Sequence, residues 1–308
     1  MKRIKMIVQY LGTNYAGWQV QPNHITVQGE IQKAIEQGLG EQVEIFGSGR
    51  TDAGVHAFGQ VAHFDTNSRI NPSKLYNVIN RFLPKDIRVL STEQVSDTFH
   101  ARFNVKQKTY EYHFYCSEVN LPLLDATHAR IRFPFDFSRA LQACQAFVGT
   151  HDFKGFCGAN TKVKDTIRTI YSISLSASVD NAESLCDFEP EENKISQNGT
   201  LDTKQIGIKG VEVSDSNSND IFNTKKVVLN VIDENNSSNQ CMKGAYCLSV
   251  TGNGFLYNMV RIIAGTIIEV GCGQKNAEDM KDIIASGERN RAGRTAQPCG
   301  LVLKEVNY

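Results

Sequence analysis

The chain has 308 residues, of which 41% are apolar, and this composition suits a packed core and excludes a wholly disordered chain. The length accommodates two domains, and no apolar run reaches the roughly 18 residues that a membrane-spanning helix needs. The net charge is zero, but residues 180–243 carry 12 acidic and 6 basic side chains, so the remainder has 27 basic and 21 acidic side chains. A basic body of this kind is compatible with an RNA partner.

The first eight residues read as an edge strand and not as a signal peptide, so we expect a cytoplasmic protein. The eight cysteines include no Cys-x-x-Cys pair and no neighbouring histidine pair at ligand spacing. We therefore expect reduced, scattered thiols and no metal site. No phosphate-binding loop or dinucleotide fingerprint occurs in the sequence.

The first hundred residues predict a mixture of strands and helices in α+β order. Thr26 is placed to cap a helix with apolar residues at every fourth position, and Asn71-Pro72 is a typical helix start. The predicted strands are 3–10, 42–47, 57–66 and 86–95, and the predicted helices are 27–39 and 72–82.

A second mixed unit follows, and no clear sequence repeat relates it to the first. Its predicted strands are 108–116, 168–179, 244–251 and 301–306, and its predicted helices are 136–148, 256–270 and one that begins at 276. The helix 256–270 is largely apolar and contains one interior arginine, Arg261.

Residues 180–243 differ from the rest in containing ten asparagines and seven serines. Such a composition buries little apolar surface, so we read the segment as a partly ordered insertion. Residues 211–213 and 226–232 could form a hairpin within it. A partner-binding arm is the alternative interpretation.

The most informative segment is the glycine-rich stretch 47–56, which carries Arg50 and Asp52. An aspartate in a turn often bonds only to its own backbone. With three glycines around it and an arginine two residues away, Asp52 could instead be a nucleophile, a base or an electrostatic partner for a substrate. Residue spacing does not choose between these roles.

The sequence resembles the TruA-type tRNA pseudouridine synthases. The segment FGSGRTDAGVH (46–56) looks like the catalytic motif of that family, and further segments match it in order over nearly the whole chain except 180–243. These are YLGTNYAGWQ (10–19), TVQGE (26–30), FHARF (99–103), KTYEY (108–112) and GFLYNMVR (254–261).

The resemblance implies that the protein isomerises uridine to pseudouridine at nucleotides 38–40 of the tRNA anticodon stem-loop, with Asp52 as the essential carboxylate. The carboxylate would either attack the sugar or assist glycal formation, and the sequence leaves this open. An ionised carboxylate beside the anomeric carbon, shielded from water, is needed in both cases. The isomerisation requires no redox partner, so we expect no cofactor.

Three further roles follow from the resemblance. Arg261 is expected to pair with Asp52, although an arginine here could also extend its head group to solvent. Arg50 is expected to contact phosphate and fill the space of an extruded nucleotide, or else to be a surface turn residue. Tyr110 is expected to stack on the uracil, whereas a tyrosine in a strand usually packs in the core.

His100, Arg102 and Lys108 are expected to contact the RNA backbone. His56 and His63 are interpreted as structural. The longer connector at 180–243 departs from the family pattern.

The predicted fold is α+β, with two related subdomains whose mixed and antiparallel sheets are flanked by helices and adjoin at a basic cleft. The N-terminal subdomain would be 1–104 and the C-terminal one 105–308, interrupted at about 180–243. The resemblance implies tRNA as partner and a homodimer, and the lack of a long apolar run predicts no membrane association. A catalytically silent tRNA-binding protein, or a pseudouridine synthase for another RNA, remains open.

Overall fold

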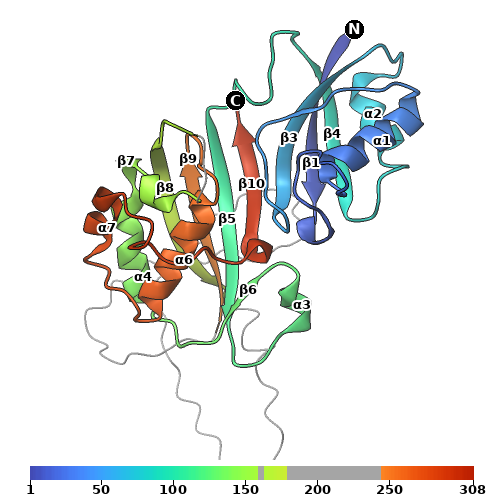
Figure 1. The fold of residues 1–308 in the computed structure, drawn as a ribbon. Helices are drawn as coiled ribbons and strands as arrows, with labels where there is room; N and C mark the ends of the chain where they lie inside the picture. The colour runs from blue at the N-terminus through green and yellow to red at the C-terminus, as the bar shows by residue number, and fades with distance from the viewer. Residues whose placement is uncertain (159–162, 179–243) are drawn as a thin grey trace, which may run out of the picture.

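The computed structural model describes residues 1–158, 163–178 and 244–308. These residues form one ten-stranded mixed sheet in the order β4-β1-β3-β10-β5-β9-β8-β7, with β2 paired to β3 and β6 paired to β5. Helices α1 and α2 lie beside one end of the sheet, and α4, α6 and α7 lie beside the other (Figure 1). The α+β class expected from the sequence is confirmed.

Residues 1–104, the N-terminal half, supply one end of this sheet. Its elements are β1 (Lys2–Tyr10), α1 (Val27–Leu39), β2 (Phe46–Gly47), β3 (His56–Thr66), α2 (Leu75–Ile79) and β4 (Ile87–Val95). The Thr26 hydroxyl accepts a hydrogen bond from the Gly29 amide, which satisfies one free donor of α1 and contributes about 1 kcal/mol to its stability.

Residues 105–308, the C-terminal half, supply the rest. Its elements are β5 (Gln107–Cys116), α3 (Pro122–Asp125), β6 (Ala129–Ile131), α4 (Phe137–Cys144), β7 (Gly149–Asp152), β8 (Ile167–Ser178), β9 (Ala245–Gly252), α6 (Met259–Gly271), α7 (Met280–Ser286) and β10 (Leu301–Asn307). No helix among the described residues is long and apolar enough to cross a bilayer. The hairpin considered at 211–232 lies outside the described residues.

The strand β10 joins the two halves. It runs parallel to β3 and antiparallel to β5, so that Ala57, Leu303 and Tyr110 lie in one row across the sheet. The row continues through Val250 on β9 to Ile173 on β8, and all five side chains are buried. The glycine-rich loop ends where β3 begins, so this junction brings the loop toward Tyr110.

Several predicted boundaries were wrong for local reasons. Residues 42–45 are not a strand, because the carbonyls of Val43 and Ile45 accept hydrogen bonds from glutamine side chains of α1. The helix expected over 72–82 begins with a 3-10 turn and ends at Ile79, since the next residue, Asn80, bonds through its side chain to Val89 on β4.

Two predicted helix starts in the C-terminal half also lie further along the chain. The helix expected from 256 begins at Met259, after Asn258 adopts a left-handed backbone with φ of 62°. The helix expected from Asn276 begins at Met280. The short elements α3, β6 and β7 were not anticipated from the sequence.

Candidate active site

The loop between β2 and β3 carries Arg50 and Asp52. Gly54 has φ of +77°, a conformation that L-residues other than glycine rarely adopt. A Cβ at Gly49 would lie 2.7 Å from Nζ of Lys108, so a side chain there would displace that ammonium group. The glycines therefore set the path of the loop and let Lys108 approach its backbone.

The segment that follows β1 holds the far side of this loop. The Trp18 amide donates to the Thr51 carbonyl at 3.0 Å, and the Gly54 amide donates to the Tyr15 carbonyl at 3.4 Å. The hydroxyls of Tyr10 and Thr51 lie 2.8 Å apart, and both side chains are buried. The motif at residues 10–19 thus fixes the backbone on both sides of Asp52.

A buried glutamine fixes the near side. Gln60 is fully buried on β3, accepts a hydrogen bond from the Ser48 hydroxyl at 2.6 Å and donates to the Gly49 carbonyl at 3.1 Å. Buried polar groups that lose their partner cost about 1–3 kcal/mol each. The network therefore favours one loop conformation.

Arg261 on α6 lies beside the catalytic candidate, with its Nη1 atom 3.6 Å from Oδ2 of Asp52. The same guanidinium donates from Nη1 to Oδ1 of Asn258 at 2.9 Å and from Nε to the Ala296 carbonyl at 2.8 Å. The pair expected from the sequence is therefore present, and the two other hydrogen bonds orient the guanidinium toward the carboxylate.

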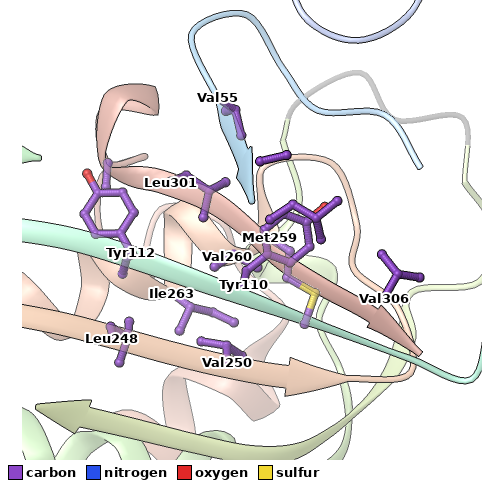
Figure 2. Packing of buried hydrophobic residues seen from close by; sticks show 14 of the residues in the cluster. Val55, Tyr110, Tyr112, Leu248, Val250, Met259, Val260, Ile263, Leu301 and Val306 are labelled. Atoms are coloured by element: carbon purple, nitrogen blue, oxygen red, sulfur yellow. The ribbon is translucent and has the colours of Figure 1, made fainter. Parts of the chain in front are cut away.

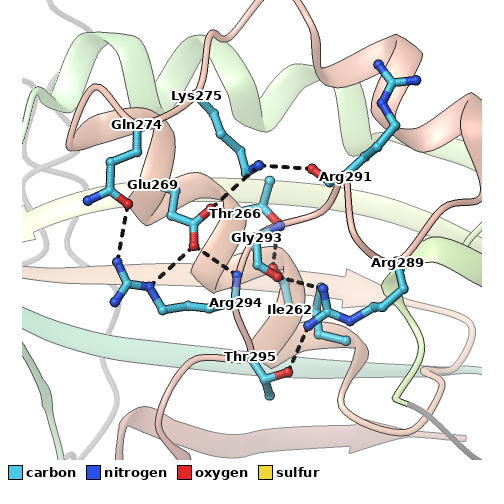
Figure 3. Close-up of polar contacts among 10 residues, drawn as sticks. All are labelled: Ile262, Thr266, Glu269, Gln274, Lys275, Arg289, Arg291, Gly293, Arg294 and Thr295. Atoms are coloured by element: carbon cyan, nitrogen blue, oxygen red, sulfur yellow. Dashed lines mark hydrogen bonds and ion pairs between the residues drawn. The ribbon is translucent and has the colours of Figure 1, made fainter.

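A polar network holds the chain that presents Ala296 (Figure 3). Glu269 on α6 accepts hydrogen bonds from the backbone amide and Nε of Arg294, and Thr266 accepts one from the Gly293 amide. A Cβ at Gly265 would lie 1.9 Å from the Arg294 carbonyl oxygen. The segment before Ala296 therefore packs directly on α6, which fixes the distance between Ala296 and Arg261.

The electrostatics of Asp52 are a balance between burial and its partner. Burial raises the pKa of this carboxyl above its ordinary value, while the Arg261 charge and hydrogen bond pull it down. Side-chain exposure is 27% for Asp52 and 15% for Arg261, so the pair is shielded and still open to a ligand. The sequence predicted the opposing cation, and the structure adds that burial is the larger effect.

Tyr110 lies on the face of β5 that packs against α6, together with Tyr112 and near Met259, Val260 and Ile263 (Figure 2). Its ring meets Phe255 edge-on at a centroid distance of 5.3 Å. Burial is the main cause that raises the Tyr110 pKa, and the nearby Asp52 charge adds to it. Tyr110 is thus both part of the core and a neighbour of Asp52.

The other residues singled out from the sequence lie around the loop. Arg50 is exposed, and Arg102 is exposed on the turn that precedes β5. Lys108 is half-buried, donates from Nζ to the Ser48 carbonyl at 2.7 Å, and has its pKa lowered to about 8 by burial and by Arg102. The structure therefore brings Lys108 to the loop itself.

The histidines interpreted as structural are buried and hydrogen-bonded. His56 accepts from the Gly12 amide through Nδ1 at 2.8 Å, and His63 accepts from the Ala101 amide at 3.2 Å. The supporting roles of Tyr10, Gln60 and Asn258 were not identified from the sequence. The available signal for Gln60 was a polar residue within a predicted strand.

Glu111, His113 and Cys247 have ligand atoms within 4.8 Å of one another and could hold a divalent cation, which the cysteine spacing did not anticipate. Glu111 and His113 lie on the face of β5 opposite Tyr110, because alternate strand residues point to opposite faces, and Cys247 on β9 is paired with His113. Nζ of Lys304 lies 3.7 Å from Glu111 and already supplies positive charge there.

A hollow of about 650 Å³, lined by residues of β7 and α7, contains no residue of the loop.

A carboxylate on a rigid glycine-rich loop, paired with a fixed arginine beside a buried tyrosine, is the arrangement of an enzyme site and not of a simple turn. The sequence matches the tRNA pseudouridine synthase family over residues 6–104 and 143–308, and the chain belongs to this family. It is 38% identical to a tRNA pseudouridine synthase A of Brevibacillus brevis and 36% identical to one of Acetivibrio thermocellus, and each match covers all of both chains.

Proposed function

We propose that this protein isomerises uridine to pseudouridine in the anticodon stem-loop of tRNA, and that Asp52 is its catalytic carboxylate. In this reaction the bond between N1 of uracil and C1′ of the ribose breaks, and a bond between C5 and C1′ forms. N1 gains a proton and C5 loses one, so substrate and product have the same composition. The observation that carries the proposal is the Asp52–Arg261 pair next to Tyr110.

In the proposed reaction, the ionised Asp52 acts on the ribose at C1′, either as a nucleophile or by assisting glycal formation. Arg261 favours the ionised form of the carboxylate and orients it. Tyr110 presents its ring to the uracil, which must stay in the pocket while it rotates. Because a base in a stack is inaccessible, the target nucleotide is extruded toward Asp52.

The basic side chains around the loop fit contacts with the RNA backbone. We propose that Arg50 occupies the space the extruded nucleotide leaves, and that His100 and Arg102 contact phosphates. The Lys108 ammonium has three donors, of which one bonds to Ser48, so the others are available to a phosphate. The excess of six positive charges outside residues 180–243 supports an RNA substrate.

We also propose that the enzyme acts in the cytoplasm as a homodimer, with one tRNA contacting both subunits. Sedimentation equilibrium of the free protein measures whether it is a dimer, and a tRNA titration measures how many tRNA molecules each dimer binds. A monomer at all concentrations, binding one tRNA with full activity, would contradict the dimer.

The test of the reaction is an incubation with an unmodified tRNA transcript, followed by mapping of pseudouridine by mass spectrometry. Asp52→Asn and Asp52→Ala should each lower the rate by at least about 10²-fold while tRNA binding persists. Asp282→Asn, an exposed aspartate on α7, is the matched control and should retain the wild-type rate.

The outcomes separate the alternatives. Tight tRNA binding without product from any RNA would favour a catalytically silent binding protein. Product only in another RNA, or at other tRNA positions, would overturn the anticodon assignment. Substantial activity in either Asp52 variant would remove that residue as the catalytic group.

A further inference from the structure

Three aromatic rings stand in a row at the start of the glycine-rich loop, and we refer to Phe46, His100 and Phe103 as the aromatic row. The His100 ring lies 5.5 Å from that of Phe46 and 4.3 Å from that of Phe103, measured between centroids. Phe103 is 75% exposed and Phe46 is 38% exposed. Among the described residues, Phe103 is the most exposed phenylalanine, and with Phe46 and His100 it forms an aromatic cluster that is open to water.

The aromatic row is rigid because it packs on a buried histidine and is held by hydrogen bonds. His63, which is 2% exposed, stacks on Phe46 at 5.1 Å and meets His100 at 4.8 Å. Nδ1 of His100 accepts a hydrogen bond from the Arg102 amide at 3.1 Å, and the His100 amide donates to Oδ1 of Asn104 at 2.6 Å. The Phe103 ring is therefore presented on a fixed support.

One end of the aromatic row lies at the start of the loop that carries the candidate active site. Phe46 begins β2, and the loop with Arg50 and Asp52 follows directly. Lys108, whose side chain bonds to the loop at Ser48, belongs to the same strand as Tyr110. Arg102 and Lys106 flank Phe103 in the sequence, and both are exposed.

We propose that the aromatic row is a stacking platform for one unpaired nucleobase of the RNA substrate, close to the target uridine. This inference rests on the proposed function, because it takes the extruded uridine to be held at Asp52. Aromatic side chains bind unpaired bases through their π faces, and cations beside them bind the adjoining phosphates. The flanking charges of Arg102 and Lys106 complement RNA, which favours a nucleotide over an apolar protein surface as the occupant.

The first test measures the affinity for an unmodified tRNA transcript by filter binding, in the Asp52→Asn background so that no turnover occurs. Phe103→Ala should raise the Kd about tenfold, the typical loss of one stacked base. Phe103→Trp should restore binding, whereas Phe103→Leu, which keeps an apolar side chain without a ring, should not. Phe133→Ala removes another exposed phenylalanine, 53% exposed, and is the matched control without effect.

The second test identifies the base. Anticodon stem-loop RNAs with a single abasic site at each unpaired position are bound to the Phe103 and Phe103→Ala forms. At one position the abasic site should weaken binding to the Phe103 form about tenfold and cause no further loss in Phe103→Ala. If the two losses multiply at every position, no base stacks on Phe103 and the platform is overturned.

Two further outcomes are decisive. A change of oligomeric state in Phe103→Ala, seen by light scattering, would make the aromatic row a contact between copies of this chain and would overturn the inference. Failure of the proposed reaction is distinguishable, because it appears as missing pseudouridine in the wild type. Unchanged tRNA affinity in Phe103→Ala, with an active wild type, rejects the platform alone.

Discussion

The Arg261 guanidinium has three partners, and it can therefore both orient the Asp52 carboxylate and lower its pKa. Two of its hydrogen bonds go to Asn258 and Ala296, so the ion pair at 3.6 Å adds little to stability, on the order of 1 kcal/mol. Its larger effect is on the carboxyl, whose pKa burial raises and Arg261 lowers. Asp52 is the acid on which the proposed chemistry depends.

Replacing Arg261 with methionine should therefore shift the acidic limb of the pH profile. Without the cation, the pKa of Asp52 rises further, so a larger fraction is protonated and inactive at a given acidic pH. We expect the acidic limb of kcat/KM to move up by about one pH unit or more, measured in single-turnover assays from pH 4 to 8. Arg261→Lys keeps the charge and should keep the limb near its wild-type position; equal losses at every pH in both variants would contradict this account.

Lys108 offers a second pH-dependent measurement. Its pKa of about 8 lies below that of an unfolded lysine, about 10.4, so between these values the unfolded chain binds the additional proton. Stability should then rise with pH across this window because of Lys108. The stability of the wild type relative to Lys108→Met should increase by on the order of 2 kcal/mol from pH 7 to 9.5, in urea unfolding.

The control for this comparison is Lys106→Met, since Lys106 is exposed two residues away. Its stability relative to the wild type should not change over the same pH range. A parallel pH dependence in wild type and Lys108→Met would mean that the ammonium at Ser48 is not buried as described.

At the scale of elements, α6 and the segment before Ala296 act as one unit. Gly265 and Gly293 allow the two backbones to touch, and Glu269 and Thr266 bond across the contact (Figure 3). This contact sets the position of the carbonyl that orients Arg261. The helix thus contributes its arginine to the site, and the later segment fixes how that arginine points.

Gly265→Ala should push the segment before Ala296 away from α6. The new methyl group would lie 1.9 Å from a backbone oxygen, so the segment must shift, at a cost of about 1–3 kcal/mol in unfolding free energy. Thermal unfolding and the pseudouridine assay should both show a loss, because Ala296 moves with the segment. Gly29→Ala in α1 meets a side-chain hydroxyl at 3.1 Å and should stay within about 1 kcal/mol of the wild type; equal stability of both variants would contradict the close approach.

At the scale of the whole molecule, β10 makes the two halves one sheet, since it pairs with β3 on one side and β5 on the other. We propose that residues 1–104 and 105–308 are related units that meet at this strand. Asp52 comes from the first and Tyr110 and Arg261 from the second. The proposed site therefore depends on the junction between the halves.

The same sheet predicts how the connector between β8 and β9 can be replaced. The backbones of Ser178 and Ala245 are directly paired in an antiparallel ladder, so a two-residue Asn-Gly turn can close the strands as a hairpin. A chain with 179–244 replaced in this way should retain its fold and its pseudouridine synthesis, measured by circular dichroism and the tRNA assay. Loss of folding would show that the replaced residues belong to the core.

The sequence by itself determined the α+β class, most strands and helices and the glycine-rich loop, because motif order and hydrophobic periodicity are local properties of the chain. The pairing of Asp52 with Arg261 was implied by the resemblance to a known family. The sequence did not predict the glutamine side chains that bond to the carbonyls before β2, or the hydrogen bonds between the Asn80 side chain and Val89. Nor did it predict the left-handed backbone of Asn258, after which α6 begins. Hydrophobic periodicity does not predict hydrogen bonds from side chains to the backbone, nor a left-handed residue. Only the tertiary structure decided that β10 joins the halves, that Lys108 reaches the loop, and that burial outweighs Arg261 at Asp52, because desolvation and contact are set by what packs around a residue.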